Sequence, residues 1–93
     1  MTTEQLNNLI IECKKGLGIS IEPNEAIDGV VKQKILIIVA YMKGSGVNDE
    51  TIAENDLSTG VIVLGVTDLW NLNSGEVKFS PVFNTLLTQL AAG

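Results

Sequence analysis

Two side chains common in enzyme active sites, histidine and arginine, are absent from this chain of 93 residues. Histidine is the commonest general base and metal ligand, and arginine is the usual clamp for phosphate and carboxylate groups. Catalytic and metal-binding chemistry therefore has little to build on here. We expect no enzymatic activity, no cofactor and no bound metal ion.

Positive charge is also scarce. Six lysines stand against eleven acidic residues, which gives a net charge of −5. A DNA-binding protein needs a basic face to neutralise phosphates, and its affinity then falls with salt. We therefore expect no sequence-specific binding of nucleic acid.

Cysteine and long apolar runs are equally limited. The single Cys13 excludes an internal disulfide and is compatible with a reducing compartment. Met1 to Gln5 lacks the basic and apolar regions of a secretory signal. The longest apolar run, Ile35 to Met42, is far shorter than the about 20 residues that span a bilayer. We expect a soluble, intracellular protein without a membrane partner.

What the chain does contain is apolar surface, since 45% of its residues are hydrophobic. A chain of this length forms one domain, residues 1–93, and buries only about 60–65% of the surface that it exposes when unfolded. Excess apolar surface on a small domain is a mild argument for self-association or for a large partner interface.

Helix signals dominate the first half. Thr2 or Thr3 can cap a first helix that Gly16 or Gly18 ends. Its apolar residues recur at three- and four-residue spacing, and so form one stripe. They are Leu6, Leu9, Ile10, Cys13 and Leu17.

A second helix is predicted from Asn24 or Glu25 to Lys43. In its early half we expect an inward face of apolar residues, with Lys32 and Lys34 outward. Its later half, Ile35 to Met42, is apolar on all sides and must be covered on every side. We therefore expect this to be the central helix, with part of its cover coming from a neighbouring subunit. The expected inward residues of the early half are Ile27, Val30, Val31 and Ile35.

The second half is less uniform. Asn48 or Asp49 caps a short helical turn, and residues 57–71 then have strand-like propensity but near-helical spacing of leucine and valine; we favour helix. Asn71 to Gly75 is turn-forming, and Ser80 with Pro81 begins a last helix. That helix has a predicted buried stripe of Val82, Phe83, Leu86, Leu87 and Leu90.

The predicted fold class is therefore all-α. We expect a compact bundle of four main helices plus a short helical turn, with one extended loop before the last helix.

A search for chemistry finds little. Cys13 lies on the stripe of the first helix and is interpreted as a small core residue rather than a nucleophile. Trp70 and Tyr41 are interpreted as core residues, with a subunit interface as the alternative. The acidic group does not match a calcium loop, and we interpret it as solvated surface. It comprises Asp49, Glu50, Glu54 and Asp56.

Four segments together resemble a known family. They are Lys14 to Ile19 after the first helix, Ile38 to Val47 in the second, Val66 to Trp70 at the end of the third, and Ser74 to Pro81 before the last. In these segments the chain resembles the small head–tail connector proteins of tailed bacteriophages and prophages, the head-completion or DNA-packaging adaptors. The resemblance spans nearly the whole chain but includes no catalytic motif.

The resemblance implies a mostly helical protein that assembles into a ring, possibly twelvefold, below the phage portal protein. Such a ring extends the channel through which DNA passes, and offers a surface to a tail or stopper protein. It would be made in the bacterial host cytoplasm and end at the head–tail junction of the virion. An acidic channel wall suits this role because DNA would pass without sticking.

Candidate residues for these surfaces follow from the resemblance and from the apolar and exposed segments. For the subunit interface we expect Ile38, Tyr41, Met42 and Trp70. For contacts with partners or for the channel we expect two loops. Their polar residues are Asp49, Glu50, Glu54, Asp56, Asn73, Ser74, Glu76 and Lys78.

Two other classes of function compete with this one. A small phage-encoded regulatory module that binds a partner protein would act as a monomer or dimer, so its oligomeric state would distinguish it from a ring. A small enzyme or metal-binding domain would have to act without histidine.

Overall fold

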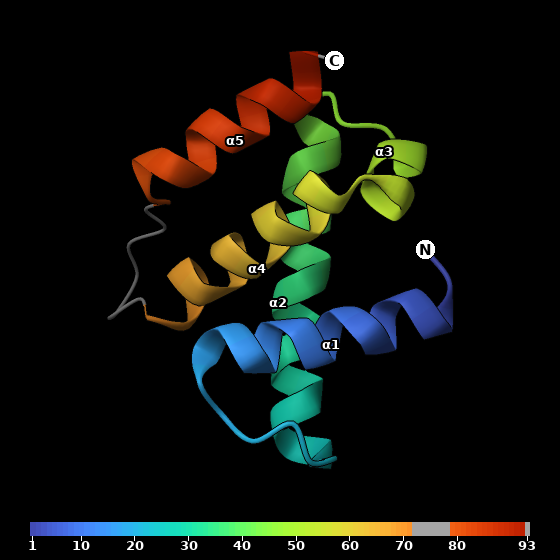
Figure 1. The fold of residues 1–93 in the computed structure, drawn as a ribbon, viewed down its shortest axis with the longest axis vertical. Helices are drawn as coiled ribbons and strands as arrows, with labels where there is room; N and C mark the ends of the chain where they lie inside the picture. Colours follow the sequence, from blue (N-terminus) through green and yellow to red (C-terminus); the bar gives the residue numbers. More distant parts are fainter. Residues whose placement is uncertain (72–78, 93) are drawn as a thin grey trace.

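Five helices make up the parts of the chain that the computed structural model describes, residues 1–71 and 79–92. Four are long and one is a short helical turn, which confirms the all-α prediction (Figure 1). The extended loop predicted before the last helix lies largely outside the described residues. The helices are α1 (Thr3–Leu17), α2 (Glu25–Gly44), α3 (Asp49–Glu54), α4 (Asp56–Trp70) and α5 (Pro81–Ala92).

The helix ends lie where local side-chain chemistry places them. Thr2 forms a capping box with Gln5 at the start of α1, and Gly18 ends this helix with a left-handed backbone, φ 71°. Asparagine side chains cap the next three helices by accepting backbone N–H bonds within the first turn. These caps are Asn24 for α2, Asn48 for α3 and Asn55 for α4.

The start of α5 is held in two ways. The Ser80 hydroxyl accepts a hydrogen bond from the N–H of Phe83 at 3.3 Å, which confirms it as the cap. The Ser80 N–H in turn donates to the carboxylate of Asp68 in α4 at 3.0 Å. The first residue of α5 is Pro81, whose missing N–H is not needed there.

Helix α4 has the most extensive contacts with the other described helices, whereas the sequence predicted the second helix to be the central one. Helix α4 packs against α1, α2, α3 and α5. Gly65 allows the close approach, because a Cβ at this position would lie 2.7 Å from Phe83 and 2.8 Å from Ile38. Residues 57–70 are thus confirmed as helical, since tertiary burial outweighs their strand propensity.

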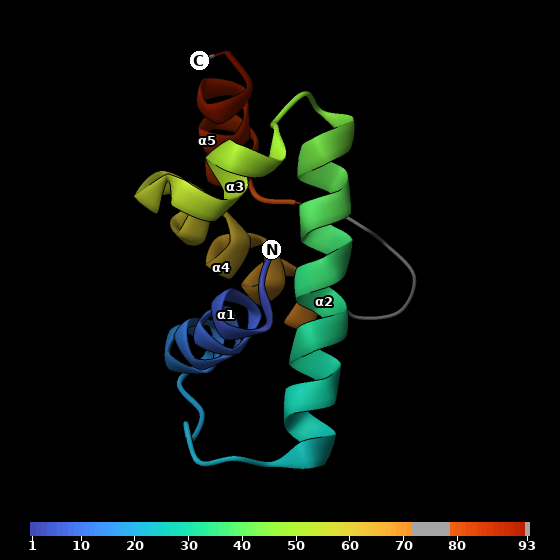
Figure 2. The same ribbon diagram turned by 90° about the vertical axis from the view of Figure 1, so that its right-hand side faces the viewer.

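The helices form a thin slab of two layers. Helix α2 stands alone in one layer, and α1, α3, α4 and α5 lie on one side of it (Figures 1 and 2). The molecule measures 36 × 31 × 18 Å, and its two broad faces belong to the two layers. Of the helices that the structure describes, none has both the length and the apolar character needed to cross a membrane.

The core lies between the layers and corrects several predicted burials. Cys13 is fully buried, as expected for a core residue. The inward prediction is wrong for Ile27 and Val30, which are exposed on α2, and for Val82, which is 59% exposed on α5. Each lies on a side of its helix that no other described helix covers. The fully enclosed apolar side chains are Cys13, Val31, Ile35, Ile38, Met42, Val61, Ile62, Val66 and Phe83.

Candidate functional site

One candidate surface is the side of α2 that faces away from the other helices. We call it the α2 outer face, and define it by five large apolar residues that are 37–53% exposed. Their positions cover about four turns of the helix, in an upper and a lower group that Gln33 and Lys34 separate. An exposed apolar patch of this kind usually marks a site of interaction. The residues are Ile27, Val30, Leu36, Ile37 and Tyr41.

The charges beside this strip are positive. After Asp28, the only charged residues of α2 are Lys32, Lys34 and Lys43. Lys43 pairs with Asp49 at 2.7 Å, while Lys32 and Lys34 form no ion pair with any described residue. The α2 outer face is therefore an apolar strip beside two lysines that have no acidic partner among the described residues, in a protein with a net charge of −5.

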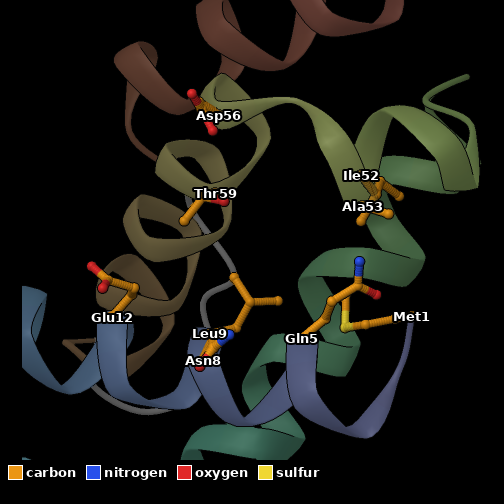
Figure 3. A pocket seen from close by; sticks show the side chains of 9 residues that line it. All are labelled: Met1, Gln5, Asn8, Leu9, Glu12, Ile52, Ala53, Asp56 and Thr59. Atoms are coloured by element: carbon orange, nitrogen blue, oxygen red, sulfur yellow. The ribbon is translucent and has the colours of Figure 1, made fainter.

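A second candidate surface is a groove of about 390 Å³ between α1, α3 and α4. No residue of α2 lines it, and the three helices that do all belong to the other layer (Figures 2 and 3). Its apolar lining consists of Met1, Leu9, Ile52 and Ala53.

The polar lining of this groove is acidic. Glu12 on α1 and Asp56 on α4 contribute carboxylates, and no lysine in the described parts of the chain lines the groove (Figure 3). Glu12 lies 3.4 Å from Lys15, an exposed pair of little energetic weight. The neutral polar residues Gln5, Asn8 and Thr59 complete the lining. The charged side chains that line the groove are thus of opposite sign to Lys32 and Lys34.

A buried lysine fixes the connection between α1 and α2. Lys14 is 1% exposed, and its ammonium group donates to Asp28 and to the backbone carbonyl of Glu22, both at 2.7 Å. The hydrogen bond from Lys14, followed by that from the N–H of Asn24, lowers the pKa of Asp28 below its usual value. These bonds from Lys14 therefore hold the loop between α1 and α2 in place. Neither Lys14 nor Asp28 belongs to the α2 outer face or to the groove lining.

The predicted interface residues divide into two pairs. Ile38 and Met42 are fully buried inside the subunit, so the prediction that they contact another subunit is wrong for this fold. Both side chains lie on the side of α2 that the other layer covers, and they pack in the core between the two layers. Tyr41 and Trp70 are exposed at 43% and 36%, contrary to the favoured interpretation of both as core residues.

Tyr41 lies at the edge of the α2 outer face. Its ring centroid is 5.1 Å from that of Phe79 and 6.0 Å from that of Phe83, and these two rings stack at 4.4 Å. One part of the ring therefore holds α5 against α2, and the remainder is free for contact.

The four acidic residues predicted as one surface are spread over different environments. Asp49 is paired with Lys43, and this bond lowers the pKa of Asp49. Glu50 and Glu54 line a shallow depression on α3, and Asp56 lines the groove. Within residues 1–71 and 79–92, no three such groups lie close enough to hold a metal ion. The remaining loop residues, Asn73, Ser74, Glu76 and Lys78, lie outside the described residues.

The one cysteine has no reactive setting. Burial, with a smaller contribution from the neighbouring Glu12, raises the pKa of the Cys13 thiol to about 12. At neutral pH the side chain is a protonated thiol in the core.

Comparison with family models, with curated proteins and with solved structures finds no match to this chain. The functional argument therefore depends on the surfaces themselves.

The sequence analysis predicted neither the groove nor the outward direction of Leu36 and Ile37. The groove combines residues of three helices, so no local pattern signals it. The α2 outer face did have a signal: an all-apolar helix in a chain this small has no second layer to cover it.

Proposed function

We propose that this chain is a structural adaptor of tailed-phage assembly, located in the virion at the head–tail junction. In this role it forms an oligomeric ring below the portal protein, extends the DNA channel and gives a tail or stopper protein a surface for attachment. The observation that carries the proposal is the α2 outer face, with Leu36 and Ile37 exposed at 49% and 53%.

The physical reason is the cost of leaving this strip in water. Burying apolar surface contributes about 25 cal/mol per Å², and five large side chains in one strip provide a substantial area. A chain that works by assembly places such a strip where another protein covers it. The family resemblance supplies the identity of the assembly, and the acidic charge is compatible with a channel that DNA traverses.

A second candidate is a small phage-encoded regulatory module that binds a partner protein. The same apolar strip favours it, since an amphipathic surface can receive a partner helix. This candidate would be a monomer or dimer and would not form a ring.

Native mass spectrometry over a concentration series, alone and with purified portal protein, distinguishes the two. A discrete ring, close to the twelvefold symmetry of a portal, is the expected result with or without the portal as template. A monomer or dimer that also ignores the portal would contradict the adaptor proposal and favour the regulatory module.

A further inference from the structure

The two candidate surfaces lie on opposite broad faces of one thin slab and differ in charge. The α2 outer face is apolar with Lys32 and Lys34 beside it, and the groove is apolar with Glu12 and Asp56 in its lining. We propose that the α2 outer face of one copy docks in the α1/α3/α4 groove of the next copy. This inference rests on the proposed ring and names the two surfaces that build it.

Charge argues for this pairing over a symmetric contact between two α2 helices. In an antiparallel α2 pair, Lys34 lies close to the midpoint of the strip from Ile27 to Tyr41, so the two Lys34 side chains would face each other. Like charges in direct contact are destabilising. Against the groove, the same lysines meet carboxylates.

Geometry favours the same arrangement. A contact between two different surfaces is heterologous, and repeated heterologous contacts close into rings or continue as filaments. Because the surfaces lie on opposite faces, each copy can bind one neighbour on each side. A symmetric α2 contact would instead stop at a dimer.

The face that contains the groove is also large enough. The molecule extends 36 × 31 Å across its two longer axes, which leaves room for the about 800 Å² per partner that a standard interface buries. Helix α2 has 20 residues and so is about 30 Å long. It can lie along the face that contains the groove.

Complementation of two blocked variants tests the pairing. Ile37→Asp places a charge in the apolar strip, and Ala53→Arg fills the groove and repels the lysines. Both positions are exposed, so the fold should tolerate the changes, and circular dichroism checks this. Val82→Asp is the matched control, since it makes a similar change at an exposed position outside both surfaces.

Each blocked variant alone should lose self-association by about tenfold or more, while Val82→Asp keeps it. An equimolar mixture of the two blocked variants should form a one-to-one heterodimer, because one intact α2 outer face meets one intact groove. Added salt should weaken this heterodimer, since its charges are near the surface.

Three results would overturn the inference. Self-association of Ala53→Arg at the wild-type level would indicate a symmetric α2 contact. Rings that both variants still form would place the interface elsewhere and leave the adaptor role intact. If the wild-type chain forms a ring only on the portal, the two variants are assayed there, and a ring that either variant forms would overturn the pairing without contradicting the adaptor role.

Discussion

At the residue scale, the environment of Lys14 differs most from what its position in the sequence predicts. A lysine in the last turn of a helix usually interacts with the helix dipole in water, yet this one is buried and bonded to Asp28 and Glu22. The sequence contains both partners, but Asp28 lies fourteen residues further on. Only the loop between α1 and α2 brings them together.

The ion pair predicts a specific pH dependence. Since the pKa of Asp28 is lowered in the folded state, its contribution to stability is fully present above the unfolded pKa, about 3.9, and is lost as the pH falls through the lowered value. Asp28→Asn should therefore lower Tm at neutral pH, and the difference from wild type should shrink below about pH 4. Thermal unfolding of both proteins over this pH range measures it.

Asp49→Asn is the control for this prediction. Asp49 also has a lowered pKa, but its partner Lys43 is exposed and regains water when the bond is lost. The control should lose less stability than Asp28→Asn. The prediction would be contradicted if the two variants lost equal stability, or if Asp28→Asn lost none at neutral pH. In either case the pair of Asp28 with the buried Lys14 would stabilise the fold no more than an exposed pair does.

At the scale of helices, most boundaries could be predicted from the sequence. Caps, terminal glycines and Pro81 act within one turn, so they signal locally, and the structure places α1, α2 and α5 within a few residues of the predicted positions. Residues 57–71 were ambiguous because valine and isoleucine favour strands. Contacts of α4 with the four other helices decide in favour of helix.

Two glycines of α4 make this argument testable. A Cβ at Gly65 would lie within 3 Å of Phe83 and Ile38, whereas a Cβ at Gly60 would meet nothing within 4 Å. Gly65→Ala should therefore lower the free energy of unfolding by about 1–3 kcal/mol. Gly60→Ala should raise it by about 0.5–1 kcal/mol, since alanine favours helix and space is available.

Urea denaturation of the two variants provides the measurement, and Gly60→Ala serves as the matched control in the same helix. A stable Gly65→Ala would mean that α4 can shift away from α2 and α5 at little cost. Gly65 is thus a site of close helix approach, while Gly60 faces open space.

At the scale of the whole molecule, the distribution of charge leads to a prediction about DNA. The net charge is −5, and the lysines without a partner among the described residues lie on the α2 outer face, which the proposed assembly covers. We therefore expect no salt-dependent affinity for DNA.

Fluorescence anisotropy with single- and double-stranded DNA at low and physiological salt tests this expectation, with a basic DNA-binding protein as positive control. An association constant whose logarithm falls linearly with the logarithm of the salt concentration would reveal contacts with DNA phosphates. That result would contradict a channel through which DNA passes passively.

The sequence by itself determined the all-α class, the helix ends and the shortage of catalytic groups, because these depend on composition and on residues within one turn of each other. Tertiary structure alone decided which apolar residues remain exposed. Ile37 and Ile38 are neighbours of the same type, yet one is 53% exposed and the other fully buried. The difference arises because α1, α4 and α5 cover α2 from one side only, and so leave the side chains on its opposite face exposed.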